Sequence, residues 1–204
     1  HELTHELTLR RLQFQYYRDQ LLTFDSDVEF VSLGDVCEMK AGKSISSSDI
    51  CQEKRNDYFP VYGGNGFRGY YKTFSHEGSF SIIGRQGALC GNVQYAEGKF
   101  YATEHAVVVA NLKNLESRFL YHLLTYMDLN QYKTTGAQPG LSVSNLKSLK
   151  IPIPPIEQQK KIAAILDRFD SLCNDLTSGI PAVINARKKQ YQYYRDKLLT
   201  FTQK

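Results

Sequence analysis

The sequence predicts an α+β fold, in which a globular mixed α/β domain is flanked by long amphipathic helices. The first observation is a repeat, because residues 10–24 and 187–201 are identical at eleven of fifteen positions. The second is the region between these copies, where short apolar runs end at Gly, Asn or Ser, as strands do. Matching helical ends around a different middle indicate one globular domain between two copies of a helix.

Each copy of the repeat is predicted to be an amphipathic helix. In the second copy, Ile184, Tyr191 and Leu198 recur every seven residues. Tyr194 follows Tyr191 by three residues, which completes an apolar stripe along one helix face. An isolated helix cannot bury such a stripe, so each copy needs a partner surface. The spacing leaves open whether that partner lies in the same chain or in another.

A further helical pattern precedes the second copy. A proline pair favours a helix start, and Glu157 places an acid in the first turn. Apolar residues then recur at spacings of three or four until Gly179 and Pro181 interrupt the pattern. Two helices are therefore expected, over about 157–177 and 182–201. The residues expected to pair along this arm are Ile162, Leu166, Phe169, Leu176, Ile184, Tyr191, Tyr194 and Leu198.

The middle of the chain is predicted to hold a sheet and one helix. Strand patterns cover residues 59–62, 80–83, 91–95 and 105–110. Residues 116–129 have a helical spacing of Phe and Leu, and residues 146–153 are expected to form a last strand. The expected division is a helix over 1–24, a globular domain over 25–153 and a helical region over 154–204, broken near Gly179 and Pro181.

Composition limits the classes of function. The net charge is +4, and residues 39–155 carry thirteen Lys and Arg against eight Asp and Glu. This balance is compatible with phosphate contacts but does not by itself identify a nucleic-acid ligand. No apolar run approaches about 20 residues, so no membrane span is predicted. A cytoplasmic location is expected, where cysteines stay reduced. The four cysteines are expected to be free thiols, and no Cys/His spacing suggests a metal site.

Two glycine-rich loops carry candidate functional side chains. Residues 64–69 formally match the GxGxxG dinucleotide motif, but a strand-like YYKTF follows where that site needs a helix. A hairpin that presents Asn65 and Arg68 fits better. The segment GRQG resembles the GXXG loop of KH domains, again without the required helix. Arg85 and Gln86 remain, with donors suited to guanine and adenine edges respectively; a surface turn without a ligand is the alternative.

A third loop and one acid–base pair complete the candidates. The loop over 134–142 contains Gly and Pro that fix its backbone, and its Gln138 and hydroxyl groups suit DNA bases or phosphates. Glu104 and His105 suggest acid–base chemistry, but no partnered nucleophile accompanies them, so a structural role is expected. The sequence therefore predicts neither a catalytic residue nor a metal ligand.

Long stretches of the chain resemble the specificity subunits of type I restriction-modification systems. They are GRQGALCGNVQYAEGKFYATEHAVVV (84–109), GAQPGLSVSNLKSLKIPIPPIEQQKKIAAIL (136–166) and the QYQYYRDKLLTF helix. A full member of that family alternates two DNA target-recognition domains with two conserved helical regions, which pack as an antiparallel coiled coil. This chain has one recognition domain, one complete helical region and part of another. The resemblance therefore implies a half-sized subunit, whether natural, truncated or engineered.

The resemblance implies a DNA-reading component without chemistry of its own. Each recognition domain of the family reads one half of a bipartite DNA site. Modification subunits bring S-adenosylmethionine and methylate adenine, and a restriction subunit brings ATP-driven cleavage, so no cofactor is expected on this chain. Expected partners are double-stranded DNA, these two kinds of subunit, and a second copy bound through the helical arms. The alternative is a helical adaptor or decoy that binds modification subunits without reading DNA, as the balanced charge of residues 25–155 allows.

The residues expected to contact DNA share a polar side chain and a place in a loop. Arg85 carries the sharpest expectation, because its loss should weaken binding to the cognate site far more than binding to random DNA. The expected contacts are Lys43, Ser44, Asn65, Arg68, Arg85, Gln86, His105, Lys133, Thr135 and Gln138.

Overall fold

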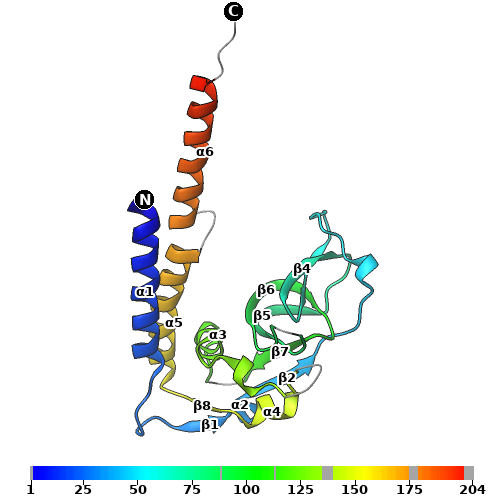
Figure 1. Ribbon diagram of the computed structural model, residues 1–204. Coiled ribbons are helices and arrows are strands. Elements are labelled where there is room, and N and C mark those ends of the chain that lie inside the picture. The colour runs from blue at the N-terminus through cyan, green and yellow to red at the C-terminus, as the bar shows by residue number, and fades with distance from the viewer. Residues whose placement is uncertain (1, 88, 113, 135–139, 175–178, 200–204) are drawn as a thin grey trace, which may run out of the picture. The chain divides into compact units, whose positions relative to one another are not determined.

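The computed structural model describes residues 2–87, 89–112, 114–134, 140–174 and 179–199 (Figure 1). The chain divides into two compact units: residues 24–161 form a globular unit, and residues 1–23 with 162–204 form a helical unit. The globular unit extends beyond the expected boundary at residue 153 into the first turns of the next helix. In the described part of the chain, no helix combines the length and the apolar character that a bilayer span requires.

A curved six-stranded sheet forms the centre of the globular unit (Figure 1). Its strands are β2 (Cys37–Ala41), β3 (Phe59–Gly63), β4 (Gly66–Tyr71), β5 (His76–Gly84), β6 (Val93–Ala102) and β7 (Ala106–Asn111). The strand order is β2-β7-β5-β6-β3-β4, and neighbours are antiparallel except for β3 and β6. Each strand predicted between residues 59 and 110 overlaps an observed one, because apolar runs between turn residues are a local signal.

The core of this sheet is built from apolar residues of β5, β6 and β7. Ile82, Phe100 and Val108 are almost fully buried, and small alanines lie among them. Phe100 stacks on the imidazole of His76 with ring centroids 5.3 Å apart. Alanines next to large rings let the layer pack closely, and each buried Phe or Ile side chain contributes about 1.5–3 kcal/mol to folding.

Helix α3 (Ser117–Tyr126) packs on β5 and β6 and buries its Phe and Leu side chains. It begins at Glu116, whose carboxylate accepts a hydrogen bond from the Phe119 N–H at 2.5 Å. A carboxylate there also suits the positive end of the helix dipole. The helix ends before the predicted residue 129, because Asp128 adopts a left-handed φ of 46° and a 3₁₀ helix, η2 (Leu129–Tyr132), follows.

Helix α5 (Ile156–Asn174) begins in the globular unit, where its Gln159 is fully buried. The Gln159 amide donates to the carbonyls of Asn114 at 3.0 Å and Pro154 at 2.8 Å. Its oxygen accepts the Glu116 N–H at 2.8 Å. One side chain therefore satisfies three backbone groups and joins the first turn of α5 to the start of α3.

Short elements complete the globular unit. They are β1 (Phe30–Ser32), α2 (Leu33–Val36), the 3₁₀ helix η1 (Ser47–Asp49), α4 (Val143–Ser148) and β8 (Lys150–Pro152). β1 and β8 pair as a two-stranded antiparallel sheet. The strand predicted over 146–153 is wrong in its first part, because α4 occupies it. Ser142 explains the helix, since its Oγ accepts a hydrogen bond from the Asn145 N–H at 3.0 Å and so caps α4.

The helical unit contains α1 (Glu2–Leu22), most of α5, and α6 (Ile180–Leu199). α5 and α6 are separate helices, and the second begins between Gly179 and Pro181, the residues that interrupt the apolar pattern in the sequence. Proline is tolerated there because the first turn of a helix needs no N–H donor.

α1 and α5 are antiparallel neighbours (Figure 1). Phe169 packs on Phe14 and Tyr17, with ring centroids 6.2 Å and 5.6 Å apart. One turn further along α5, burial raises the pKa of the Cys173 thiol, and the positive charge of Arg11 opposes this rise. The two helices therefore run in opposite directions. An antiparallel coiled coil along the whole arm stays a prediction.

Candidate nucleic-acid interface

Several loops of the globular unit meet at one place, where backbone hydrogen bonds join them. The Arg85 N–H donates to the His105 carbonyl at 2.9 Å, and the Leu141 N–H donates to the Arg85 carbonyl at 2.9 Å. Lys43 forms a bridge with Thr103 in the same turn as His105. Backbone bonds of this kind fix where each side chain leaves its loop. The loops joined in this cluster cover residues 42–44, 85–87, 103–105 and 140–141.

Glycines bring the turn between β3 and β4 into this cluster. A Cβ on Gly84 would lie 2.0 Å from the carbonyl oxygen of Gly64, and a Cβ on Gly64 would lie 3.0 Å from that of Gln86. Only glycine permits such an approach of two backbones. The predicted hairpin is confirmed, since β3 and β4 pair antiparallel and Asn65 is exposed in their turn. The glycine motifs of the sequence therefore serve close backbone packing.

Three side chains lie next to one another on this surface. The Nδ1 of His105 is hydrogen-bonded to the Oε1 of Gln86. The other ring nitrogen, Nε2, lies 3.3 Å from the Oε1 of Glu104. The imidazole is 43% exposed and the carboxylate 39%, so both remain within reach of a ligand. Glu104 and His105 thus orient the Gln86 amide.

Arg85 leaves the same loop as Gln86 and is partly buried. Its Nε is buried without a hydrogen-bond partner among the described residues, and so are the Oε2 of Glu104 and the Oγ1 of Thr103. A buried polar atom without a partner costs about 1–3 kcal/mol. Among the described residues, three of the four atoms of this kind lie in the loop cluster, and the Oγ of Ser81 is the fourth.

The predicted phosphate-contacting lysines belong to the same group of loops. Lys43 and Ser44 are exposed directly after β2. The Nζ of Lys133 donates to the Oδ1 of Asn130 at 2.8 Å. Asn130 in turn donates to the carbonyl of Cys90 at 2.6 Å, in the loop between β5 and β6. Lys133 is therefore attached to the loop that carries Arg85.

Arg68 is held away from the turn that carries Asn65. Its Nη2 donates to the Oγ of Ser47 at 3.4 Å. Its side chain also covers Gly63, where a Cβ would lie 2.6 Å from the Arg68 Cδ. The alternation of side chains along β4 explains the separation, because Arg68 leaves the strand beside η1. Its guanidinium belongs to the neighbouring surface around residues 47–51 rather than to the loop cluster.

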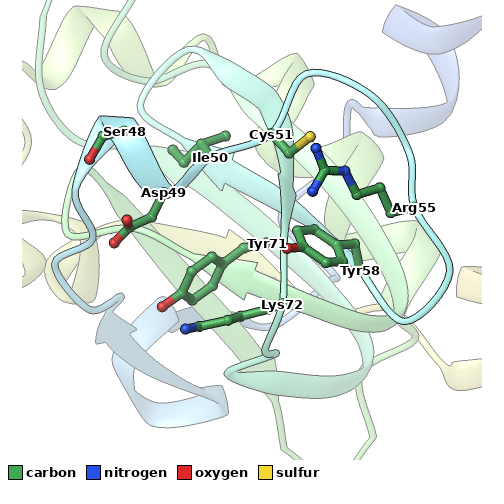
Figure 2. A pocket seen from close by; sticks show the side chains of 8 residues that line it. All are labelled: Ser48, Asp49, Ile50, Cys51, Arg55, Tyr58, Tyr71 and Lys72. Carbon is green, nitrogen blue, oxygen red and sulfur yellow. The ribbon is translucent and has the colours of Figure 1, made fainter.

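That neighbouring surface contains a pocket of about 350 Å³, which the sequence did not reveal (Figure 2). Arg55 and Lys72 bring two positive charges to it and Asp49 one negative charge. Tyr58 and Tyr71 contribute their rings, and the Arg55 guanidinium carbon lies 5.6 Å from the Tyr58 ring centroid. These charges come from a loop and a strand end that are distant in sequence, so no motif marks them. The pocket suits an anionic group.

The predicted helix-pairing residues fall into two groups. In α5, Ile162 and Leu166 are buried. In α6, Ile184 is partly buried, whereas Tyr191 and Tyr194 are 69% and 51% exposed. The second half of α6 therefore presents uncovered aromatic rings in the single chain.

Some predicted residues lie outside the described part of the chain. They are Thr135, Gln138, Leu176 and the side chain of Leu198. Within the described ranges, no group of three or more His, Cys, Asp or Glu side chains is placed to hold a metal ion.

Residues 25–186 match a known family, the type I restriction modification DNA specificity domain. The chain is 52% identical over 174 residues to the EcoprrI type I restriction enzyme specificity subunit of Escherichia coli. This alignment covers 83% of this chain and 43% of that subunit. It is 32% identical over 213 residues to a putative type I specificity subunit of Mycoplasma pneumoniae, covering 98% of this chain and 88% of the other. The matched region contains every loop of the candidate interface.

Solved structures share the fold. The S subunit of a type I restriction-modification system from M. genitalium aligns with a TM-score of 0.75 at 19% identity, over 92% of this chain and 54% of that one. The HsdS subunit from Thermoanaerobacter tengcongensis aligns with a TM-score of 0.64 at 18% identity, over 86% and 46%. The chain thus spans about half the length of these two proteins. The predicted α+β fold is confirmed. Because the family match covers residues 25–186 and these relatives are specificity subunits, the chain belongs to the DNA specificity family of type I restriction-modification systems.

Proposed function

We propose that the globular unit reads one half of a bipartite site in double-stranded DNA. The observation that carries the proposal is the meeting of the loops 42–44, 64–65, 85–87 and 103–105 in one backbone-braced cluster. Polar side chains leave this cluster from fixed positions, so little conformational entropy is lost when DNA binds. Family membership supports the assignment, because the matching domain is described as a DNA specificity domain.

Affinity and selectivity come from different side chains in this proposal. Lys43 and Lys133 meet phosphates, which gives binding that salt weakens and that does not depend on sequence. Arg85 and Gln86 meet base edges, where a good contact discriminates by about 1–3 kcal/mol. The pocket in Figure 2 suits a further phosphate, because its lining is more cationic than anionic.

The helical unit, in the same proposal, binds the other subunits of a type I system. α6 exposes Tyr191, Tyr193 and Tyr194 by 69%, 61% and 51%. Tyrosine is favoured at protein interfaces because it joins a large apolar ring to a polar tip. A second copy bound through these arms would supply the second half-site reader and convert two short readings into one specific site. S-adenosylmethionine and ATP then belong to the modification and restriction subunits, and the complex works in the cytoplasm.

A selection experiment tests the proposal. The full chain is mixed with its modification subunits and a pool of randomised duplexes, and the bound duplexes are sequenced. We expect one half-site to be enriched, by about tenfold for each specified base pair. Arg85→Ala should then reduce binding to the enriched duplex far more than binding to random duplex. If every sequence binds alike while the modification subunits are still captured, the chain is a helical adaptor instead.

A further inference from the structure

We propose that Gln86 reads its base as a hydrogen-bond donor only, and therefore selects guanine or thymine over adenine. The inference rests on the proposed function and adds the chemistry of one base-reading position. Sequence alone favours adenine for Gln86, because a free glutamine amide offers one acceptor and one donor to the adenine edge. The fold removes the acceptor from this pair.

The Gln86 amide uses its oxygen inside the loop cluster. Its Oε1 is hydrogen-bonded to the Nδ1 of His105. Among the described residues, the Nε2 of the same amide has no hydrogen-bond partner, and the side chain is exposed. The adjacent Gly87 has open space around the position that a Cβ would take. The N–H₂ group is therefore the part of the amide that remains for DNA.

His105 is held so that it keeps this oxygen. Its Nε2, on the other side of the ring, lies 3.3 Å from the Oε1 of Glu104. An amide oxygen can only accept, so the Nδ1 of His105 carries the proton and is the donor in this hydrogen bond. Turning the Gln86 amide over would set its N–H₂ against the ring N–H, so that two donors would face each other. The His105 carbonyl also accepts the Arg85 N–H at 2.9 Å, which keeps the two loops together.

The donors and acceptors on the base edges of the major groove determine which bases this amide prefers. Guanine offers the acceptors N7 and O6, and thymine offers O4. Cytosine presents a donor, and adenine presents a donor beside its N7 acceptor. A donor-only amide therefore meets guanine or thymine without conflict, opposes cytosine and makes only part of the contact with adenine. Arg85, the neighbouring residue, also carries donors only.

Base-by-base selection with Gln86 variants tests the inference. The full chain with its modification subunits selects from randomised duplexes, and preferences are compared position by position. Gln86→Glu has the same length but only acceptors, so the guanine or thymine position should change to cytosine or adenine, by about tenfold. His105→Ala frees the amide oxygen and should admit adenine at that position alone. Lys43→Ala, the control, should weaken binding to all sequences alike.

Each outcome decides between the alternatives. A wild-type position that depends on Gln86 and prefers adenine or cytosine overturns the inference, and so does a His105→Ala variant that keeps the wild-type preference. Thermal unfolding at the wild-type temperature shows that each variant is folded. If the wild-type chain selects a sequence but no position of that sequence changes in the Gln86 variants, the inference is wrong and the proposed function stands. A wild-type chain without any sequence preference removes the proposed function as well.

Discussion

Replacement of Gln159 by methionine perturbs the most completely buried polar side chain at the start of α5. Gln159 is 0% exposed and bonds the backbones of Glu116, Asn114 and Pro154 at 2.8, 3.0 and 2.8 Å. Methionine has a similar length and fills a similar volume, but it has no N–H group and only a weak acceptor. The substitution therefore removes the hydrogen bonds while leaving the packing nearly intact.

The size of the effect follows from these bonds. Each hydrogen bond contributes about 0.5–1.5 kcal/mol net, and a buried backbone group left without a partner costs about 1–3 kcal/mol. Methionine removes one partner of each bond and leaves three backbone groups unpaired, so the second figure applies, and the free energy of unfolding should fall by about 3 kcal/mol or more. At about 2–4 °C for each kcal/mol, the melting temperature should fall by roughly 10 °C.

Urea denaturation of the full chain, followed by circular dichroism, measures this loss. Hydrogen exchange at the Glu116 amide locates it, because that N–H loses its acceptor. Gln158→Met is the matched control: Gln158 is the exposed neighbour, and its replacement should change the free energy of unfolding by less than about 0.5 kcal/mol. Equal losses in the two variants, or a loss below about 1 kcal/mol for Gln159→Met, would show that this hydrogen-bonded contact is not stabilising.

Further substitutions and reagents probe the loop cluster and the core. Gly84→Ala should destabilise the chain strongly, because the new Cβ would lie 2.0 Å from a backbone oxygen. Gly87→Ala places its Cβ in open space and costs only the strain of a φ of +89°, about 1–2 kcal/mol. Equal losses of stability in urea denaturation of the two variants would contradict this. Lys43→Ala should lower the slope of log affinity against log salt by about 1 and leave base preference unchanged in anisotropy titrations; an altered preference would make it a base contact. Burial raises the pKa of the Cys37 thiol to about 12, so at about pH 8 a thiol reagent should label the partly exposed Cys51 first, and equal labelling rates by mass spectrometry would count against a closed core.

The features that the sequence predicts correctly are those that depend on neighbours along the chain. The hairpin around Asn65 follows from glycines between two aromatic-rich runs, and the start of α6 follows from Gly179 and Pro181. The same local reasoning fails at α4, where the apolar spacing of residues 146–153 resembles a strand. The capping hydroxyl of Ser142 lies four residues before that segment and decides the outcome.

The candidate site is less predictable because its chemistry depends on residues that are distant in sequence. Polar type and loop position single out Gln86 and His105 separately, but only the fold joins the Gln86 oxygen to the His105 ring. In the same way, the Arg68 guanidinium is hydrogen-bonded to Ser47, and Arg55 and Lys72 line one pocket that no motif marks. Hydrogen bonds of this kind change which donors and acceptors a side chain can offer to DNA. Residue type alone therefore does not predict the contact that the side chain makes.

Methylation mapping tests whether this chain supplies the DNA address of its complex. DNA is taken from cells that carry the chain with its modification subunits, and methylated adenines are located by sequencing. We expect them within one bipartite motif, palindromic if two copies of the chain act together, and we expect the specified half-site to broaden when Arg85→Ala and Gln86→Ala are both introduced. An unchanged motif in that double variant, or the same motif in cells without the chain, would contradict a DNA-reading role for these loops.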